Sequence, residues 1–261
     1  MNKEISIVIP AYNSENSIAE LIKLIDSQLS PYFYNLEIII VDDCSNDNTF
    51  NKIKNLEMHN LDIKAIKLKY NVGQQNALLC GIRNSKYSYA ATIDDDLQHN
   101  PKDIIKLYEA LKSDYDIVYG LAKLPYDLPF YRNLGSYMRD ILFKTLFPYR
   151  KNTKVSSLRV MNKKAIDMIC KCKTNFVYLS AIVFSDKNIR IGNLELSYNH
   201  RKYGKSNYSL KKLAKLYLKI LVNYSNFSLF KPLKKMDSQY EISETIYINK
   251  TSNMEVDKWK Y

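Results

Sequence analysis

Three consecutive aspartates, Asp94, Asp95 and Asp96, end a short apolar run and are followed by Gln98. Like charges this close repel one another unless a cation or solvent compensates them. Alternation along an extended chain places Asp94 and Asp96 on one side and Asp95 on the other. Two carboxylates so placed can bind Mg²⁺ or Mn²⁺, whose remaining positions take water and phosphate oxygens. With a neutral oxygen from Gln98, the predicted metal site is Asp94, Asp96 and Gln98.

The alternative for this acidic run is that its side chains only cap the next helix. Asn100 already offers an N-cap side chain, and Pro101 suits the first position of a helix. Because the predicted helix has its own cap, a cation site explains the three aspartates better.

A second acidic pair, Asp42 and Asp43, ends an earlier apolar run. An acid at this place in a nucleotide-binding sheet commonly accepts hydrogen bonds from the base or ribose. The alternative is that this acidic stretch belongs to the start of the next helix, which Ser45 or Asp47 would cap. Ligands of open α/β sheets bind beyond the carboxyl ends of the strands. We therefore expect one ligand site built from four strand ends, at residues 10–13, 42–45, 71–73 and 94–98.

Several common site motifs do not occur in the sequence. It has no glycine-rich dinucleotide fingerprint and no Walker loop, so a metal and basic side chains must bind any phosphate. The four cysteines show no paired C-x-x-C spacing, which argues against a zinc site and is consistent with reduced thiols.

The elements that must position these residues alternate between strand and helix. Helical patterns separate the apolar runs, the clearest covering Ser17–Gln28. The run Glu37–Val41 is continuous, as expected of a parallel strand covered on both faces. The sequence therefore predicts an α/β fold with a mostly parallel, twisted central sheet flanked by helices. The predicted strands of the first half are Ile5–Ile9, Glu37–Val41, Ile63–Leu68, Tyr89–Ile93 and Asp116–Tyr119.

The pattern changes after Gly120. We expect a helix over Phe130–Phe147, strands at Ser156–Met161 and Ile189–Leu196, and a basic amphipathic helix over Ser209–Val222. No repeat indicates a second domain. We predict one domain over 1–235, divided into residues 1–120, residues 121–208 and a basic segment at 209–235, and a polar tail at 236–261.

The chain is strongly basic, with 39 Lys and Arg against 27 Asp and Glu in 261 residues and a net charge of +12. Such an excess favours phosphorylated substrates, an anionic membrane surface or nucleic acid, or it is simply a solvated surface. Nucleic acid is disfavoured because no recognised motif appears and the acidic strand ends repel phosphates. We see no signal peptide and no apolar stretch of about 20 residues, so we expect a cytoplasmic protein, peripheral on the inner face of the membrane.

Six stretches together resemble glycosyltransferase family 2, whose members have the GT-A fold, and more narrowly its polyprenyl-phosphate branch. The resemblance covers roughly residues 4–233, and the D-x-D-L-Q followed by proline makes it specific. The stretches are IVIPAYN (7–13), VDDCSNDNT (41–49), NVGQQNALLCGI (71–82), IDDDLQHNP (93–101), SSLRVMNKKAI (156–166) and HRKYGKSNYSLKKL (200–213).

The resemblance implies inverting transfer of a sugar from a nucleotide sugar, a UDP-sugar by preference, to a polyprenyl phosphate in cell-envelope glycan synthesis, with Mg²⁺ or Mn²⁺ as cofactor. Within the predicted domain, the resemblance makes 1–120 the nucleotide-sugar-binding half, 121–208 the acceptor-side half and 209–235 a basic amphipathic helix with a juxtamembrane-like segment. The implied catalytic residues are Asp94, Asp96, Arg201 and Lys205. The implied nucleotide-binding residues are Pro10, Tyr12, Asn13, Asp42, Asp43, Asn71, Gly73, Asp94 and Asp95. The implied phosphate- and acceptor-binding residues are Arg132, Arg159, Arg201, Lys205 and Ser206.

Three other functions stay open. The acceptor is a soluble or surface glycan in the first, and the chain binds nucleic acid in the second. In the third it is an inactive relative, because Ser14 stands where the family has an acid and Ala122 lies where relatives carry an arginine. A separate membrane-protein partner also remains open.

Overall fold

The computed structural model describes residues 3–56, 61–123, 141–150, 153–174, 176–197, 210–224, 239–249 and 252–257. Their strands are β1 (Glu4–Ala11), β2 (Asn35–Asp42), β3 (Asp62–Leu68), β4 (Tyr89–Thr92), β5 (Ile117–Ala122), β6 (Arg159–Asn162), β7 (Ile191–Leu196), β8 (Ile242–Asn249) and β9 (Ser252–Asp257).

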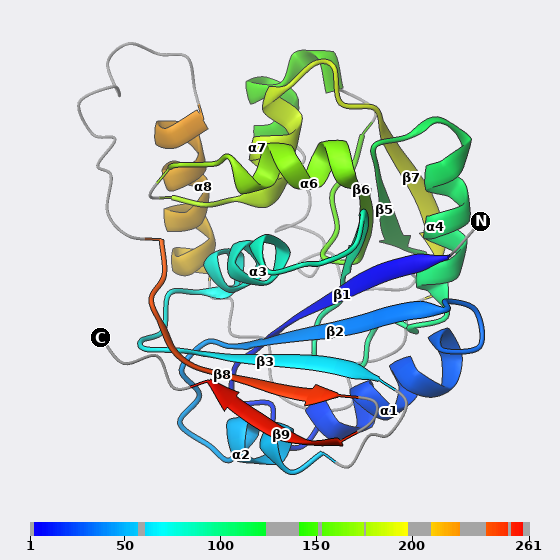
Figure 1. Ribbon diagram of the computed structural model, residues 1–261. Coiled ribbons are helices and arrows are strands. Elements are labelled where there is room, and N and C mark those ends of the chain that lie inside the picture. The colour runs from blue at the N-terminus through cyan, green and yellow to red at the C-terminus, as the bar shows by residue number, and fades with distance from the viewer. Residues whose placement is uncertain are drawn as a thin grey trace.

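These nine strands form one sheet in the order β7-β5-β6-β4-β1-β2-β3-β8-β9 (Figure 1). β6 and β8 are antiparallel to both of their neighbours, and the other strands all run in one direction. This confirms the predicted α/β fold with a mostly parallel sheet.

Helices cover both faces of the sheet (Figure 1). On one face, α1, α2 and α4 bury their apolar side chains in a first core, and on the other α3, α6, α7 and α8 do so in a second. Their bounds are α1 (Ile18–Leu29), α2 (Thr49–Lys54), α3 (Gln74–Arg83), α4 (Asp103–Asp114), α6 (Lys163–Cys170), α7 (Leu179–Ser185) and α8 (Leu210–Tyr224), with a 3₁₀ turn at Pro148–Arg150.

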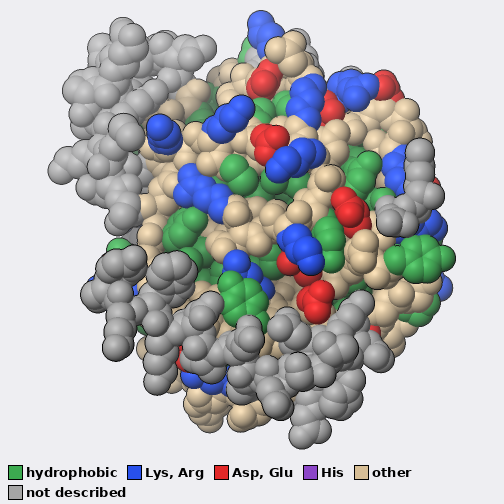
Figure 2. All heavy atoms as spheres, viewed as in Figure 1, with side chains coloured by type: hydrophobic (Ala, Val, Ile, Leu, Met, Phe, Trp, Pro, Cys, Tyr) green, Lys and Arg blue, Asp and Glu red, His purple; other side chains and the backbone are tan. Residues whose placement is uncertain are grey.

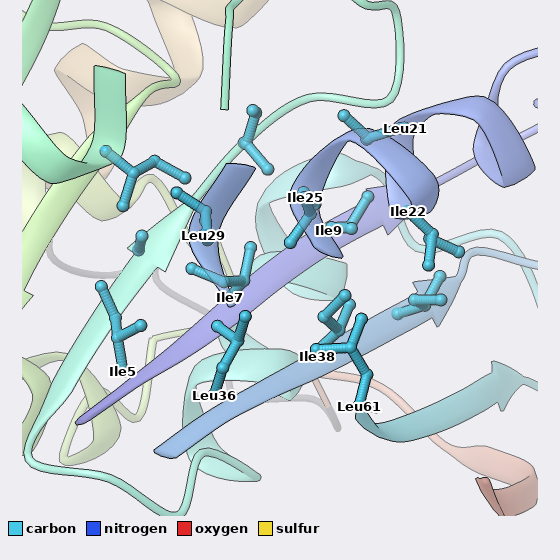
Figure 3. Close-up of a cluster of buried hydrophobic side chains, with 14 of the residues drawn as sticks. Ile5, Ile7, Ile9, Leu21, Ile22, Ile25, Leu29, Leu36, Ile38 and Leu61 are labelled. Atoms are coloured by element: carbon cyan, nitrogen blue, oxygen red, sulfur yellow. The ribbon is translucent and has the colours of Figure 1, made fainter. Parts of the chain in front are cut away.

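The two central strands carry both cores. β1 and β2 each contain seven consecutive buried residues. Successive side chains of a strand point to opposite faces, so Ile7 and Ile9 join the first core while Val8 joins the second. Figure 3 shows Ile7 and Ile9 of β1 facing Ile25 of α1. With both faces covered, only the ends of these strands are left for polar groups.

Close packing also fixes the position of α3 on the second face. A Cβ built on Gly81 would lie 2.3 Å from Cγ1 of Val8, a distance that no real side chain tolerates. Glycine at this position therefore lets the helix approach β1, and it brings the N-terminus of α3 to the carboxyl edge of the sheet.

The prediction of a polar tail at 236–261 is wrong for residues 242–249 and 252–257, which form β8 and β9. β8 pairs antiparallel with β3, and β9 pairs with β8. Ile246 and Ile248 alternate with more polar residues and are 1% and 9% exposed, so they extend the first core. Only a few apolar residues alternate in this otherwise polar stretch, so the sequence pattern alone does not predict a strand here.

The helix after the acidic run also differs from the prediction. It begins at Asp103, two residues beyond Pro101. Asn100 accepts a hydrogen bond from the backbone N of Lys102, at 3.1 Å, and so stabilises the turn before the helix.

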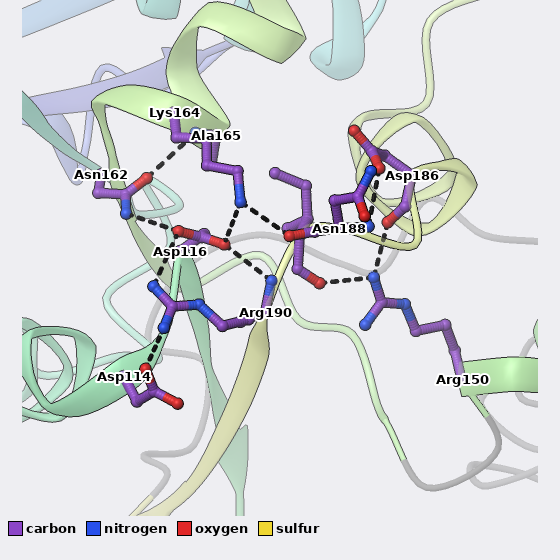
Figure 4. A network of polar contacts seen from close by, with 10 residues as sticks. Asp114, Asp116, Arg150, Asn162, Lys164, Ala165, Asp186, Asn188 and Arg190 are labelled. Atoms are coloured by element: carbon purple, nitrogen blue, oxygen red, sulfur yellow. Dashed lines mark hydrogen bonds and ion pairs between the residues drawn. The ribbon is translucent and has the colours of Figure 1, made fainter.

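A network of polar contacts surrounds Asp116, just before the start of β5 (Figure 4). The carboxylate of Asp116 is 2% exposed and accepts hydrogen bonds from the backbone N of Arg190 at 2.9 Å, from Asn162 at 3.0 Å and from Lys164 at 3.0 Å. Burial alone would raise the pKa of Asp116, but these donors outweigh it and lower the pKa to about 2. The network ties β5, β6 and β7 together.

We predict that Asp116→Asn lowers the free energy of unfolding by about 2 kcal/mol at pH 7. The folded-state pKa lies below the unfolded value, so the ionised group stabilises the fold above about pH 4 and this contribution is lost as pH falls toward 2. Urea denaturation of both proteins at pH 7 and at pH 3 measures the difference. If the difference in unfolding free energy between the two proteins is as large at pH 3 as at pH 7, the charge of Asp116 contributes nothing to stability.

Candidate active site

The loops that leave β1, β2, β3 and β4 at their carboxyl ends share an unusual backbone feature. Each contains one residue with positive φ: Asn13 at 54°, Cys44 at 59°, Gly73 at 86° and Leu97 at 60°. In the described part of the chain these are the only positive values. A left-handed conformation costs a non-glycine residue roughly 1 kcal/mol or more, and such residues concentrate at functional sites. The backbone thus marks the same four strand ends as the sequence.

Hydrogen bonds join the loops that follow β1, β2 and β4. The hydroxyl of Ser14 donates to Oδ2 of Asp95, and the backbone N of Tyr12 approaches the same oxygen at 3.4 Å. The backbone N of Asn13 donates to Oγ of Ser45 at 2.9 Å. Tyr12 itself remains 41% exposed. Its ring is therefore available to a ligand and is not a core side chain.

Asp43 has a structural task in this site. Its carboxylate is 3% exposed and accepts from the backbone N of Val72 at 2.7 Å and from that of Gly73 at 2.8 Å. Its carbonyl oxygen accepts from the side chain of Asn71 at 3.1 Å. Burial raises the pKa of Asp43, and the two backbone donors oppose that shift. Asp43 therefore holds the loop after β3 in place.

Asp42 presents an incomplete set of hydrogen bonds. Its Oδ1 accepts from the backbone N of Ser45 at 3.3 Å and from the hydroxyl of the same residue. Its Oδ2 is buried and has no hydrogen-bond partner among the residues that the structure describes. Burial raises the pKa of Asp42. Asp42 is fully buried, and its Oδ2 is an acceptor that suits a hydrogen-bond donor of a nucleoside.

The three aspartates after β4 accept hydrogen bonds from different partners. Asp95 bonds to the loop after β1, whereas Oδ1 of Asp94 accepts from Nε2 of Gln74 in α3 at 2.7 Å. Oδ1 of Asp96 accepts from the backbone N of Gln98 at 3.1 Å. Burial raises the pKa of Asp94, and repulsion from Asp96 adds to the shift. Burial also raises the pKa of Asp95, to about 6.

These aspartates fit a cation that is shared with a ligand. No set of three or more His, Cys, Asp or Glu side chains within the described ranges is arranged to hold a metal. Mg²⁺, however, is commonly bound through one or two carboxylates and the phosphates of a substrate. Asp94 and Asp96 supply two such carboxylates, and their mutual repulsion is what a cation would relieve.

A cavity of about 600 Å³ adjoins this acidic group on the side of the second core. Gln74, which bonds to Asp94, is among its lining residues, and so is Arg159 of β6. The guanidinium of Arg159 is 2% exposed and lies 5.6 Å from the ring centroid of Tyr119. The sequence indicated Arg159 as a site residue but gave no site role to the other polar lining residues, although the first five of them lie in the stretches 71–82 and 156–166: Gln74, Gln75, Asn76, Ser156, Ser157, Tyr178, Ser180 and Lys219.

Several predicted site residues lie outside the described ranges. They are Arg132, Arg201, Lys205 and Ser206. Their placement in the site stays a prediction.

Helix α8 contacts the body of the protein with its apolar side. Tyr217 is 9% exposed and Ile220 is fully buried in the second core. Figure 2 shows Lys and Arg side chains scattered over the described part of one face, with acidic side chains between them. No helix in the described part of the chain combines the length and hydropathy needed to cross a bilayer.

Comparisons with known proteins give a family and curated relatives. The model of Glycosyl transferase family 2 matches residues 6–184. An undecaprenyl-phosphate 4-deoxy-4-formamido-L-arabinose transferase from Sodalis glossinidius is 30% identical over 216 residues, which cover 82% of this chain and 65% of that protein. A dodecaprenyl-phosphate galacturonate synthase from Rhizobium johnstonii is 27% identical, with 84% and 65% covered. The matched chain thus spans just under two thirds of the length of these two relatives.

A solved structure shares the fold. Glucosyl-3-phosphoglycerate synthase from Mycobacterium tuberculosis, in complex with Mn²⁺, UDP-glucose and phosphoglyceric acid, matches with a TM-score of 0.62. The match covers 84% of this chain and 78% of that one, at 16% sequence identity. The likeness confirms the expected fold.

We predict that Asp43→Asn lowers the free energy of unfolding by about 1–3 kcal/mol, because the amide group would turn a donor toward a backbone N–H. Asp42→Asn is the matched control, since one oxygen of Asp42 has no donor to lose. Urea denaturation of both variants at pH 7 checks the difference. Equal losses would contradict the structural task of Asp43.

Proposed function

The chain belongs to glycosyl transferase family 2, and from that premise we propose that it is a metal-dependent, inverting glycosyltransferase that moves a sugar from a nucleotide donor to a polyprenyl phosphate. The observation that carries the proposal is the acidic strand end next to a cavity with a buried arginine. Gln74 joins the two, because it bonds to Asp94 and also lines the cavity that contains Arg159. The relatives from Proteus mirabilis, Rhizobium johnstonii and Sodalis glossinidius are named as undecaprenyl-phosphate or dodecaprenyl-phosphate enzymes, which supports the polyprenyl phosphate acceptor.

On the donor side, the residues bind and orient the nucleotide. The exposed ring of Tyr12 offers a surface for the base, and Oδ2 of Asp42 offers an acceptor for a nucleoside donor group. Asp94 and Asp96, with Gln98, would hold a divalent cation next to the diphosphate of the donor. When bound, the cation neutralises negative charge on the departing nucleotide. A UDP-sugar is the proposed donor, in line with the UDP-glucose bound by the mycobacterial enzyme.

On the acceptor side, the chemistry needs little proton transfer. A lipid phosphate is already an anionic nucleophile near neutral pH, so no strong general base is required. It needs positioning and charge screening next to the donor. We assign this to Arg159 and, among the residues outside the described ranges, to Arg132, Arg201, Lys205 and Ser206.

We predict that the purified protein transfers sugar from a UDP-sugar to a short polyprenyl phosphate only with Mg²⁺ or Mn²⁺ present. Asp96→Asn should lower kcat at least about a hundredfold, since it removes a ligand of the cation. Thin-layer separation of radiolabelled lipid product from a panel of nucleotide sugars measures the transfer.

Asp167→Asn is the matched control. Asp167 is a carboxylate in a partly exposed pair with Lys163, at 3.0 Å, and should leave the rate unchanged. If the protein transfers sugar to a glycan but not to the polyprenyl phosphate, the proposed lipid acceptor is wrong. A fully active Asp96→Asn enzyme would mean that the cation lies elsewhere.

A further inference from the structure

β8 begins beside the candidate site, although it is remote from the site residues in sequence. The strand is antiparallel to β3, so its first residue, Ile242, lies opposite Leu68, the last residue of β3 (Figure 1). The end of β3 is one of the four strand ends that form the candidate site. The residues just before β8 therefore lie next to the loop that follows β3.

Lys69, the first residue of that loop, is held from two sides. Its backbone N donates to the carbonyl oxygen of Glu241 at 2.9 Å, and its Nζ pairs with Oε1 of the same residue at 2.6 Å. On the other side, its carbonyl oxygen accepts from Sγ of Cys44 at 3.6 Å. Lys69 thus connects the residues before β8 with the positive-φ residue of the loop after β2.

The loop that Lys69 begins is short, so its two ends are closely linked. The backbone N of Val72 and that of Gly73 donate to the carboxylate of Asp43 at 2.7 and 2.8 Å. One residue spans at most about 3.6 Å of extended chain, and little slack therefore separates these two bonds from Lys69. Gln74, which bonds to an aspartate after β4, follows directly. A shift of Lys69 would displace backbone groups at the site.

The backbone of Glu241 is itself well held. Two residues before it, the side chain of Gln239 accepts from Arg83 of α3 at 2.6 Å and donates to the carbonyl oxygens of Cys172 at 3.1 Å and Thr174 at 2.8 Å. The pair of Lys69 and Glu241 is exposed, at 59% and 49%, and such pairs contribute little to stability. Because its backbone is held by Gln239 and by β8, Glu241 can nevertheless fix the position of Lys69.

A second ion pair of β8 offers a matched comparison. Glu244 pairs with Lys54 at 2.7 Å, and both side chains are less exposed than those of the first pair. Lys54 is the last residue of α2 and lies in none of the four loops of the site. This pair therefore attaches the same strand to a helix instead of to a site loop.

We infer that Glu241 is a positioning residue for the nucleotide sugar, which acts through Lys69 by holding the loop after β3 in its binding conformation. That loop carries Asn71 and Gly73, which are proposed to bind the nucleotide. The inference rests on the proposed function and adds to its donor site a residue that the sequence had placed in a polar tail.

A positioning role differs in sign from a simple effect of charge. Glu241 is an anion next to a site that is proposed to bind an anionic diphosphate. By long-range electrostatics alone, removing its charge should strengthen the binding of a nucleotide. Loss of a preorganised loop should weaken binding, because the nucleotide must then order the loop itself.

The test measures binding of UDP with Mn²⁺ to the full chain by calorimetry. Glu241→Gln should weaken binding about three- to fivefold, since it removes the ionic contact with Lys69 and keeps the size of the side chain. Glu244→Gln removes the same charge from the same strand and should not weaken binding. Unchanged or tighter binding by Glu241→Gln, or equal weakening in the two variants, would overturn the inference.

Sugar transfer gives a readout that a loss of stability alone would not change. Glu241→Gln should raise the KM for the nucleotide sugar about three- to fivefold and leave both kcat and the KM for polyprenyl phosphate unchanged. If transfer proceeds and the KM for the nucleotide sugar is the same in Glu241→Gln and Glu244→Gln, the function stands and the positioning role falls.

Hydrogen exchange separates this inference from the proposed function. The amides of Val72 and Gly73 are protected by their bonds to Asp43. In the nucleotide-free protein these two amides should exchange about threefold faster in Glu241→Gln than in Glu244→Gln, because a loop that is held less firmly opens more often. If the exchange differs in this way but the unmodified chain binds no UDP and transfers no sugar, Glu241 still positions the loop and the proposed function falls.

Discussion

Burial of the central strands on both faces is the constraint on which the rest of the structure depends. β1 and β2 have no solvent-facing side along seven consecutive residues, so polar groups are confined to their ends. β1, β2, β3 and β4 are parallel, and their carboxyl ends therefore meet at one edge. Chemistry can be placed at this edge without exposing either core, which is the common solution of open α/β sheets.

The same constraint concentrates negative charge. Five aspartates stand directly at two of these strand ends, Asp42 and Asp43 at the end of β2 and Asp94, Asp95 and Asp96 just after β4. Two of them, Asp43 and Asp95, are used to tie loops together. Asp94 and Asp96 repel each other, and Oδ2 of Asp42 has no hydrogen-bond partner among the described residues. This edge is thus suited to a cationic or hydrogen-bond-donating ligand, while the cavity beyond Gln74 is suited to an anionic one.

The sequence predicted the sheet well where the physical signal was strong. Continuous apolar runs such as Glu37–Val41 indicated parallel strands because each residue had to be buried. Strand alternation predicted that Asp95 points away from Asp94 and Asp96, but the three residues follow the end of β4, and Asp95 and Asp96 lie in a turn, where this alternation does not apply. The prediction was wrong at β8 and β9, where a few alternating residues in a polar stretch gain their stability by pairing with β3. The amino-acid composition of β8 does not reveal that β3, which is remote in sequence, is its pairing partner.

The sequence by itself determined which residue types stand at the strand ends, and with them the family, because local periodicity and motif order are written along the chain. Only the tertiary structure decided that Gln74, Arg159 and Lys219 line one cavity. They come from α3, β6 and α8, which are remote in sequence. Their convergence depends on how closely helices pack on the sheet, as at Gly81. Such distances arise from side chains filling space in three dimensions, and a pattern along one dimension does not contain them.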